Sequence, residues 1–343
     1  MANYQVVAVG ASAGGFQALV ELAKGLPGDF SAAVLVTIHL HPGASNVLPD
    51  LIDRAGSLRA AYAREGDEIA PGCIYIAPPD AHLLVERRRA IVRRGPRENG
   101  SRPAIDPMFR SVAATYGSHA IGVILSGALN DGSSGLQAIK ACGGLAVVQD
   151  PRDAAYSEMP TSALAATPVD HVVPLREMVP LLRRLVAQRV PSETPPSPEL
   201  QREVAIAAQR DSDVATVDRL GERSVLTCPE CHGLLWEIQD GNLVRYRCHV
   251  GHAFTLQSLE AEQATELDRA MSSALRALSE RIHLVRRLAD EARKMQHERM
   301  ARRWESRARE YEQQAGVIRA ALVKRAENGE PQDDIVELDE KRR

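Results

Sequence analysis

The sequence predicts an α/β fold with a doubly wound, mostly parallel sheet of the Rossmann-like type in its N-terminal half. Between residues 4 and 189, short aliphatic runs alternate with amphipathic stretches, which is the pattern of a parallel sheet with crossover helices. Apolar and polar residues do not alternate within these runs, as is typical of strands buried on both faces. The four clearest runs are residues 6–9, 33–36, 121–125 and 145–148. Shorter strands are expected at residues 73–76 and in a hairpin at residues 82–93.

The size and composition of the chain are those of an ordinary globular protein with two or three domains. It has 343 residues and a net charge of −3, which is too small to favour nucleic acid or a membrane surface as a bulk partner. No leader-like segment opens the sequence, and no apolar stretch approaches the ~18 residues of a membrane span. We therefore expect a cytoplasmic protein without membrane insertion. Cys73 and Cys142 stand alone and are expected to be buried thiols rather than a disulfide.

Composition divides the chain into five segments. We expect a first domain over residues 1–189 and a linker over residues 190–223, whose proline-rich start should be extended and mobile. Residues 224–254 hold a cluster of cysteines and histidines. Residues 255–327 have a helical pattern, and the charged tail at residues 328–343 should be disordered.

The first aliphatic run ends in a turn of small residues. Gly10, Ser12 and Gly14 have the spacing of a nucleophile elbow, in which a strained turn holds a serine hydroxyl above the sheet. The N–H of Ala13, which follows the serine, would then be the first oxyanion-hole donor. The alternative is a phosphate-binding turn, but the residues do not match G-x-G-x-x-G and no P-loop lysine follows.

A serine nucleophile needs a base and a carboxylate that orients the base. His39 follows the second run, and Asp131 lies in a glycine-flanked loop after the third. The carboxyl ends of parallel strands share one edge of the sheet, where ligand sites gather. His41 competes with His39, since both lie on the same face of an extended strand.

Several ordered motifs resemble the catalytic domain of the chemotaxis protein-glutamate methylesterases, the CheB-type enzymes. The resemblance extends over about residues 4–187. Its motifs lie at residues 10–15, 39–42, 65–67, 71–78, 102–109 and 126–132. It implies Ser12 as nucleophile, His39 rather than His41 as general base and acid, and Asp131 as the residue that orients the histidine.

The resemblance also implies a reaction. Methyl esters of glutamate side chains on a chemoreceptor-like protein would be hydrolysed to glutamate and methanol, with glutamine deamidation as a second activity and no cofactor in catalysis. A receptor methyltransferase would act in the same pathway. The alternatives are a weak or silent scaffold with this fold, and an esterase for an unrelated ester.

Three departures from the family pattern bear on this interpretation. Ile38 stands where many members have glutamine. Ala128 and Leu129 replace a typical Met-Gly pair, close to where a second oxyanion donor would lie. No receiver domain precedes the nucleophile turn, so phosphorylation in cis would not control the activity. Arg102 has two equal interpretations, as a substrate-holding residue or as a structural ion pair with Asp106.

The cysteine and histidine cluster predicts a small zinc ribbon. Cys228, Cys231, Cys248 and His252 have the spacing of a structural zinc site, with His232 as a further candidate for the fourth ligand. Strands at residues 234–238 and 243–247 would form a hairpin that brings the two halves of the site together. The metal would stabilise a module too small to fold on its own core. The alternative is a dithiol redox pair.

Apolar residues recur at helical spacing between Leu267 and Ala289, which indicates a helical hairpin or coiled coil with its turn near residues 296–298. We expect these helices to serve self-association into a homo-oligomer or partner binding. Basic residues are in excess over residues 281–309, but alternating charges on a long helix are typical of a solvated face. Nucleic-acid binding is therefore disfavoured.

Overall fold

The computed structural model describes residues 6–40, 43, 47–188, 194–210 and 213–328. The chain divides into two compact units, the first ending at Leu259 and the second beginning at Glu260. The expected tail at residues 329–343 lies outside the described residues. Within the described part of the chain, no helix is both long and apolar enough to cross a membrane.

The core of the first unit is a seven-stranded sheet in the order β3-β4-β2-β1-β7-β8-β9. Every neighbouring pair is parallel, which confirms the expected doubly wound sheet. The four runs noted in the sequence form its buried centre, and β3 and β9 extend its edges. The strands are β1 (Val6–Ala11), β2 (Ala33–Ile38), β3 (Arg59–Tyr62), β4 (Cys73–Ile76), β7 (Ala120–Ile124), β8 (Leu145–Gln149) and β9 (His171–Val173).

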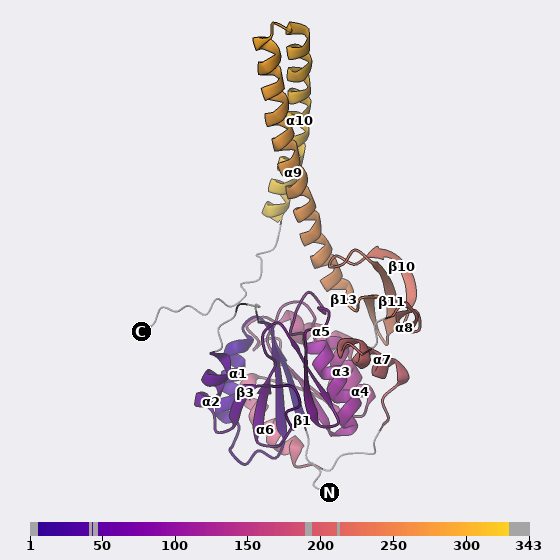
Figure 1. Ribbon diagram of the computed structural model, residues 1–343. Coiled ribbons are helices and arrows are strands. Elements are labelled where there is room, and N and C mark those ends of the chain that lie inside the picture. Colours follow the sequence, from indigo (N-terminus) through magenta and orange to yellow (C-terminus); the bar gives the residue numbers. More distant parts are fainter. Residues whose placement is uncertain (1–5, 41–42, 44–46, 189–193, 211–212, 329–343) are drawn as a thin grey trace. The chain divides into compact units, whose positions relative to one another are not determined.

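Helices cover both faces of this sheet (Figure 1). Alternate residues of β1 point to opposite faces, so Val7 and Val9 join one core while Val6 and Ala8 join the other. One face packs against α1 (Gly15–Gly25), α2 (Leu48–Ala55) and α6 (Leu175–Val186). The other packs against α3 (Ile105–Tyr116), α4 (Ser133–Ala141), α5 (Glu158–Ala166) and the separate β5–β6 hairpin (His82–Glu86 and Arg89–Arg93).

Part of the expected linker is helical. After residues 189–193, which lie outside the described part, α7 (Pro198–Ala207) and α8 (Val214–Asp218) precede the second sheet. Ser197 caps α7 by accepting a hydrogen bond from the Leu200 N–H, and Pro198 occupies the first turn, where its missing N–H costs nothing. Burial of Glu203 and Ile206 then holds the helix in place, so this part of the expected linker is ordered. The extended conformation is expected only for the proline-rich start at residues 190–198, whose last residue, Pro198, already belongs to α7.

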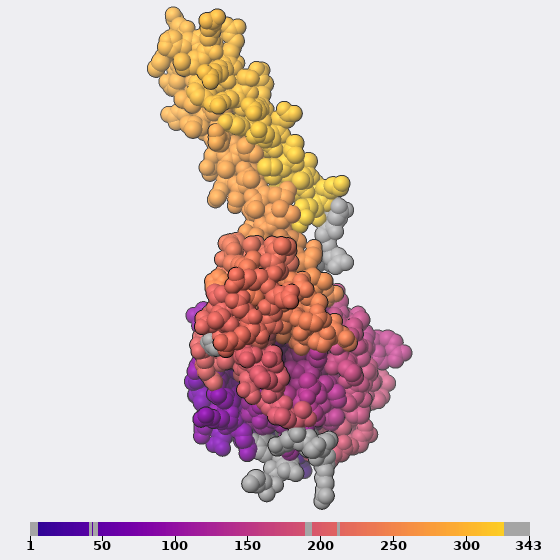
Figure 2. Space-filling model, turned by 90° about the vertical axis from the view of Figure 1, so that its right-hand side faces the viewer, coloured from indigo at the N-terminus to yellow at the C-terminus, as the bar shows by residue number. Residues whose placement is uncertain are grey.

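A second, four-stranded antiparallel sheet has the order β10-β11-β12-β13. Its strands are β10 (Glu222–Thr227), β11 (Leu234–Asp240), β12 (Leu243–Cys248) and β13 (Ala253–Thr255). The expected hairpin is β11–β12, and Gly241 provides the left-handed turn with a φ of 58°. Glu98 forms a β-bridge with Ala253, so this sheet lies directly on the N-terminal domain (Figure 2).

The second unit is a hairpin of two long helices, the residues of α9 (Leu256–Lys294) from Glu260 onward and α10 (Glu298–Asn328). The two helices are antiparallel, since Arg281 bonds Tyr311 and Arg325 bonds Asp268. Their buried seam is mostly alanine, which allows close approach. It consists of Val285, Ala289, Ala292, Ala301, Ala308 and Ala315. Gln296, with a φ of 60°, lies in the turn between them, where the sequence predicts it.

Candidate functional site

Ser12 lies directly after β1, at the point where the strand order of the sheet reverses. From β1 the chain continues to β2 on one side and later to β7 on the other. In open α/β sheets, ligands bind in the crevice at such a switch point. The left-handed residue of the turn is Gly14, with a φ of 69°, whereas Ser12 is not among the residues with positive φ. The turn therefore places its left-handed conformation at a glycine, where it has no steric cost, and the strain expected at the serine is not observed in its φ angle.

The side chains of Ser12, His39 and Asp131 form a continuous hydrogen-bonded chain. Ser12 Oγ lies 2.9 Å from His39 Nδ1, and His39 Nε2 lies 2.8 Å from Asp131 Oδ2. The three residues follow β1, β2 and β7, which are neighbours in the sheet. His39 is 22% exposed and Asp131 is 2% exposed, so the histidine is open to solvent while the carboxylate is not. His41, the competing candidate, lies outside the described residues.

Asp131 is held by several donors besides His39. The first two N–H groups of α3, from Ile105 and Asp106, point at its carboxylate, and Asn99 Nδ2 and the Gly132 N–H also donate to it. Burial alone would raise the pKa of Asp131. The hydrogen bond and charge of His39, with the bonds from Ile105 and Asn99, outweigh burial and hold this pKa below its usual value. The carboxylate therefore stays ionised and can orient the imidazole.

A second buried carboxyl group lies beside the first. Asp106 accepts hydrogen bonds from the Gly135 N–H at 2.7 Å and from Asn99 Nδ2 at 3.1 Å. Burial and the neighbouring charge of Asp131 raise the pKa of Asp106 to about 7. The two carboxyl groups thus differ in protonation at mildly acidic pH, and the one linked to His39 holds the charge.

The loop after β7 lies against the nucleophile turn. The Ser12 N–H donates to the Ser126 carbonyl at 3.0 Å, and Ser126 Oγ donates to the Ala13 carbonyl at 2.8 Å. The Leu129 N–H donates to Glu158 at 2.7 Å, and the Gly127 N–H donates to the Tyr156 carbonyl. Among the described residues, the N–H groups of Ala13 and Ala128 have no hydrogen-bond acceptor. These two N–H groups are therefore the candidate donors to an oxyanion at Ser12.

Leu129 adopts a left-handed conformation with a φ of 59°. The resemblance implies glycine at this position, and glycine takes this conformation without steric cost. For a leucine the same backbone conformation is strained by about 1–2 kcal/mol.

The guanidinium group of Arg102 is held by one carboxylate and one backbone carbonyl. It donates to Asp80 at 2.8 and 2.5 Å and to the Gly95 carbonyl at 2.8 Å. Of the two interpretations of Arg102, the ion pair with Asp106 is wrong, since its carboxylate partner is Asp80.

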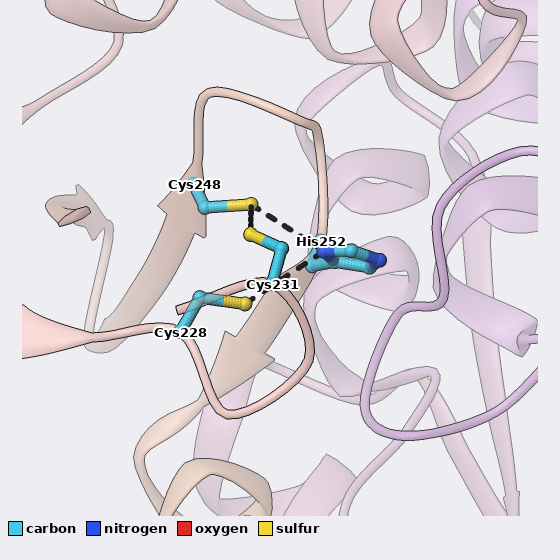
Figure 3. Close-up of side chains that lie close together, drawn as sticks. All are labelled: Cys228, Cys231, Cys248 and His252. Atoms are coloured by element: carbon cyan, nitrogen blue, oxygen red, sulfur yellow. Dashed lines mark hydrogen bonds between the residues drawn. The ribbon is translucent and has the colours of Figure 1, made fainter. Parts of the chain in front are cut away.

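Cys228, Cys231, Cys248 and His252 converge at one point of the second sheet (Figure 3). Their ligand atoms all lie within 4.8 Å of one another. The Cys231 and Cys248 sulfurs are 3.6 Å apart, and His252 Nδ1 lies 3.5 Å from Cys248 Sγ and 3.7 Å from Cys228 Sγ. A tetrahedral zinc ion with its usual bond lengths has S···S edges of about 3.8 Å and S···N edges of about 3.6 Å. The four side chains therefore fit such an ion, and within the described chain His232 is not part of the group.

A buried charge cluster joins α3, α7 and β12. We define it as Arg110, Arg245, Arg247, Glu98 and Glu203, each of which is at most 6% exposed. Glu203 Oε2 lies 3.3 Å from Arg110 Nε and 3.0 Å from Arg247 Nη2, and Glu203 Oε1 lies 3.1 Å from Arg245 Nη2. Glu98 pairs with Arg110 and Arg247. Burial opposes ionisation, but the three arginines hold the pKa of Glu203 well below its usual value.

Sequence reasoning missed Asn99, Ser126 and Glu158. Ser126 belongs to a motif already quoted for the resemblance, so its position was marked although its contacts were not. Asn99 lies in an Asn-Gly dipeptide, which by itself indicates only a turn.

The fold and the linked serine, histidine and aspartate at its switch point are those of a hydrolase. The CheB methylesterase family model matches residues 7–182, and the chain belongs to this family. In solved structures, the chain is similar to the Thermotoga maritima CheB methylesterase catalytic domain. The TM-score is 0.51 and the identity 31%, covering 53% of this chain and 99% of the other.

Two curated relatives show how far the similarity extends. A Leptospira interrogans protein, named provisionally as a protein-glutamate methylesterase/protein-glutamine glutaminase, is 39% identical over 184 residues, which are 53% of this chain and 95% of that protein. The protein-glutamate methylesterase/protein-glutamine glutaminase 2 of Pseudomonas aeruginosa is 36% identical over 193 residues, which are 55% of each chain. These matches cover about half of this chain, in line with the family match at residues 7–182.

Proposed function

We propose that this protein is a serine hydrolase that removes methyl groups from glutamate methyl esters of a chemoreceptor-like protein. The observation that carries the proposal is the hydrogen-bonded chain from Ser12 through His39 to Asp131 at the switch point of a family-typical sheet. The names of the relatives supply the substrate class, and they also include glutamine deamidation as a second reaction.

The proposed reaction has two halves. Ser12 Oγ bonds to the ester carbonyl carbon while its proton passes to His39 Nδ1, and the amides of Ala13 and Ala128 stabilise the oxyanion. His39 then gives the proton to the methoxy oxygen as the C–O bond breaks and methanol leaves. Water attacks the glutamyl ester of Ser12, again losing a proton to His39, and the serine hydroxyl is restored as glutamate is released.

Labelling with a serine-directed fluorophosphonate tests the first half of this proposal. We expect the wild type and Ser57→Ala, a control at an exposed serine away from the site, to be labelled. Ser12→Ala should not be labelled, and His39→Gln should be labelled at least a hundred-fold more slowly. An unlabelled wild type would favour the silent scaffold.

Methanol release from a methylated chemoreceptor tests the substrate. We expect the wild type to release methanol and Ser12→Ala to release none. Labelling without methanol release would instead favour an esterase for another ester.

We propose that the cysteine and histidine cluster holds a structural zinc ion. Four protein ligands leave no open position for a catalytic water, so the ion would stabilise the fold and take no part in the reaction. Residues 224–254 would then be a zinc ribbon that follows a hydrolase domain of residues 1–189.

We also propose that the helices of the second unit serve association with a second copy or a partner protein. Leu284 and Leu288 on α9, and Met295 directly after this helix, are exposed. Sedimentation analysis of the full chain and of a variant with serine at these three positions tests this assignment. Equal masses for the two proteins would contradict self-association.

A further inference from the structure

Asn99 joins the Asp131 loop to the segment that follows the second sheet. We propose that Asn99 is a positioning residue for the proposed reaction: it aligns Asp131 and takes its own orientation from Thr255 and Ser258. Part of the alignment of the site would then be supplied by residues outside the family-matched domain, which ends at residue 182. The inference rests on the proposed function for its reaction but not for its geometry.

The hydrogen-bonding capacity of the Asn99 side chain is fully used. Its Nδ2 donates to Asp131 Oδ1 at 2.9 Å and to Asp106 Oδ2 at 3.1 Å. Its Oδ1 accepts from the Thr255 N–H at 3.0 Å and from the Ser258 hydroxyl at 2.8 Å. A primary amide has two donor hydrogens and one acceptor oxygen with two lone pairs, so no capacity is left. Rotating the amide by 180° would turn its oxygen toward the Asp131 carboxylate and its NH2 group toward the Thr255 N–H, which is itself a donor. The contact with Thr255 therefore helps to select the orientation in which Asn99 donates to Asp131.

The backbone around Asn99 is held from the same side. The Asn99 N–H donates to the Ala253 carbonyl at 2.8 Å, and the Ala253 N–H donates to the Arg97 carbonyl at 3.3 Å. Asn99 is left-handed, with a φ of 52°, a conformation that asparagine tolerates better than most residues. Strand β13 thus fixes the backbone position of Asn99, and Thr255 and Ser258 fix the orientation of its side-chain amide.

A second hydrogen bond links the Asp131 loop to the same segment. Thr255 Oγ1 donates to Asn130 Oδ1 at 2.7 Å, and Asn130 immediately precedes Asp131. Thr255 Oγ1 also accepts a hydrogen bond from the Ser258 N–H at 3.2 Å. Thr255 and Ser258 are both nearly fully buried, so solvent does not compete for these bonds. The residues around Asp131 are therefore bonded to the segment 253–258 both directly and through Asn99.

Asn99 is the donor to Asp131 that a substitution can remove without changing either the reacting groups or a helix end. The other donors are His39, two N–H groups of α3 and the neighbouring Gly132 N–H. Supporting residues of this kind typically change rates by about ten- to a hundred-fold, because small displacements of reacting groups slow the chemical step. A positioning role predicts that kcat falls and that KM changes little, since Asn99 acts through Asp131 and His39.

Two variants test the inference from opposite sides. Asn99→Ser removes the donor to Asp131 and leaves a small polar residue at the left-handed position. Ser258→Ala leaves the family-matched domain intact and removes one bond to the Asn99 oxygen. Ser279→Ala is the matched control, because Ser279 lies on the same helix and, among the described residues, its hydroxyl bonds only the Leu275 carbonyl. Circular dichroism of all three variants checks that each is folded.

The readouts are the kcat and KM of ester hydrolysis, the rate of fluorophosphonate labelling of Ser12, and the far-downfield proton resonance of the His39–Asp131 hydrogen bond. We expect Asn99→Ser to lower kcat and the labelling rate about ten- to a hundred-fold and to shift or broaden the resonance. Ser258→Ala should have the same effects to a smaller degree, and Ser279→Ala should have none. Wild-type kcat, labelling and resonance in a folded Asn99→Ser variant would overturn the inference, even if its melting temperature falls. If the wild type releases no methanol, the proposed function fails, but the labelling rate and the proton resonance of the variants still test the role of Asn99. If the wild type is not labelled either, the proton resonance alone tests this role.

Discussion

Replacing Glu203 with glutamine isolates the contribution of the buried charge cluster. Glu203 is 3% exposed and lies within 3.3 Å of all three arginines of the cluster. The substitution conserves volume but leaves Arg110, Arg245 and Arg247 with Glu98 as the only carboxylate inside the cluster. Removing one partner of a buried ion pair costs about 3–5 kcal/mol, because the remaining charge is desolvated without compensation. For a unit of this size, that corresponds to a fall in melting temperature of roughly 6–20 °C.

Thermal unfolding of the full chain, followed by circular dichroism, measures this effect. Glu199→Gln is the matched control, because Glu199 lies on the same helix, is exposed and forms a partly exposed ion pair with Arg202 at 3.3 Å. We expect the control to melt close to the wild type. If both variants melt at the same temperature, the charges of the cluster do not hold α7 and the second sheet in place, and the reasoning fails.

The pH dependence of the Glu203 effect has a definite sign. The pKa of Glu203 is lowered in the folded protein, so the unfolded chain binds more protons at mildly acidic pH. The stabilisation from Glu203 is therefore complete above the unfolded value of about 4.3 and is lost as the pH falls below it. We expect the difference between wild type and Glu203→Gln to shrink when unfolding is measured below about pH 4. A difference that grows on acidification would contradict the assignment.

Three further predictions concern the candidate site and the metal cluster. Leu129→Gly should raise the free energy of unfolding by up to about 1 kcal/mol, because relief of the left-handed strain exceeds the added entropy of the unfolded chain. Leu164→Gly in α5 is the control and should lower the melting temperature; an equal fall for Leu129→Gly would contradict the prediction. The pKa of Asp106 is raised to about 7, so the native state holds an extra proton between about pH 4 and 7. Wild-type stability relative to Asp106→Asn should fall over that range, by at most about 4 kcal/mol, and level off above it; a pH-independent difference in urea unfolding would refute this. Metal analysis should find one zinc ion per wild-type chain and none in Cys248→Ser. The fluorescence of Trp236, which is buried in the wild type, should show increased solvent exposure in this variant. If the wild type contains no metal and its fluorescence equals that of Cys248→Ser, a structural zinc ion is excluded.

The sequence predicts the central strands and the linked serine, histidine and aspartate, because each has a local pattern that can be recognised. Residues 6–9 and 121–125 are unbroken aliphatic runs, and Ser12 and Asp131 lie in glycine-rich segments directly after them. Edge strands lack such a pattern. β3 is half exposed along its four residues and β9 has only three residues, so neither has a recognisable hydrophobic run.

Contacts between segments that are distant in the chain could not be predicted from the sequence. Asn99 and Asp131 are 32 positions apart, and nothing in an Asn-Gly turn indicates which carboxylate it will meet. Glu203 in the expected linker is an ordinary helical glutamate by sequence, and its burial depends on arginines more than forty positions away. The Ser-Pro-Glu start of α7 did contain a capping signal, but the prolines before it favoured an extended interpretation.

The charge cluster also bears on how this chain can change in evolution. Its members come from the N-terminal domain, from α7 and from β12, so none of the three segments can be exchanged alone without leaving an unmatched charge in a dry interior. The segments are expected to be inherited together and to vary in concert. A chimera that joins the first 189 residues to the C-terminal region of another family member is expected to lose stability unless that region supplies counterparts of Glu203, Arg245 and Arg247.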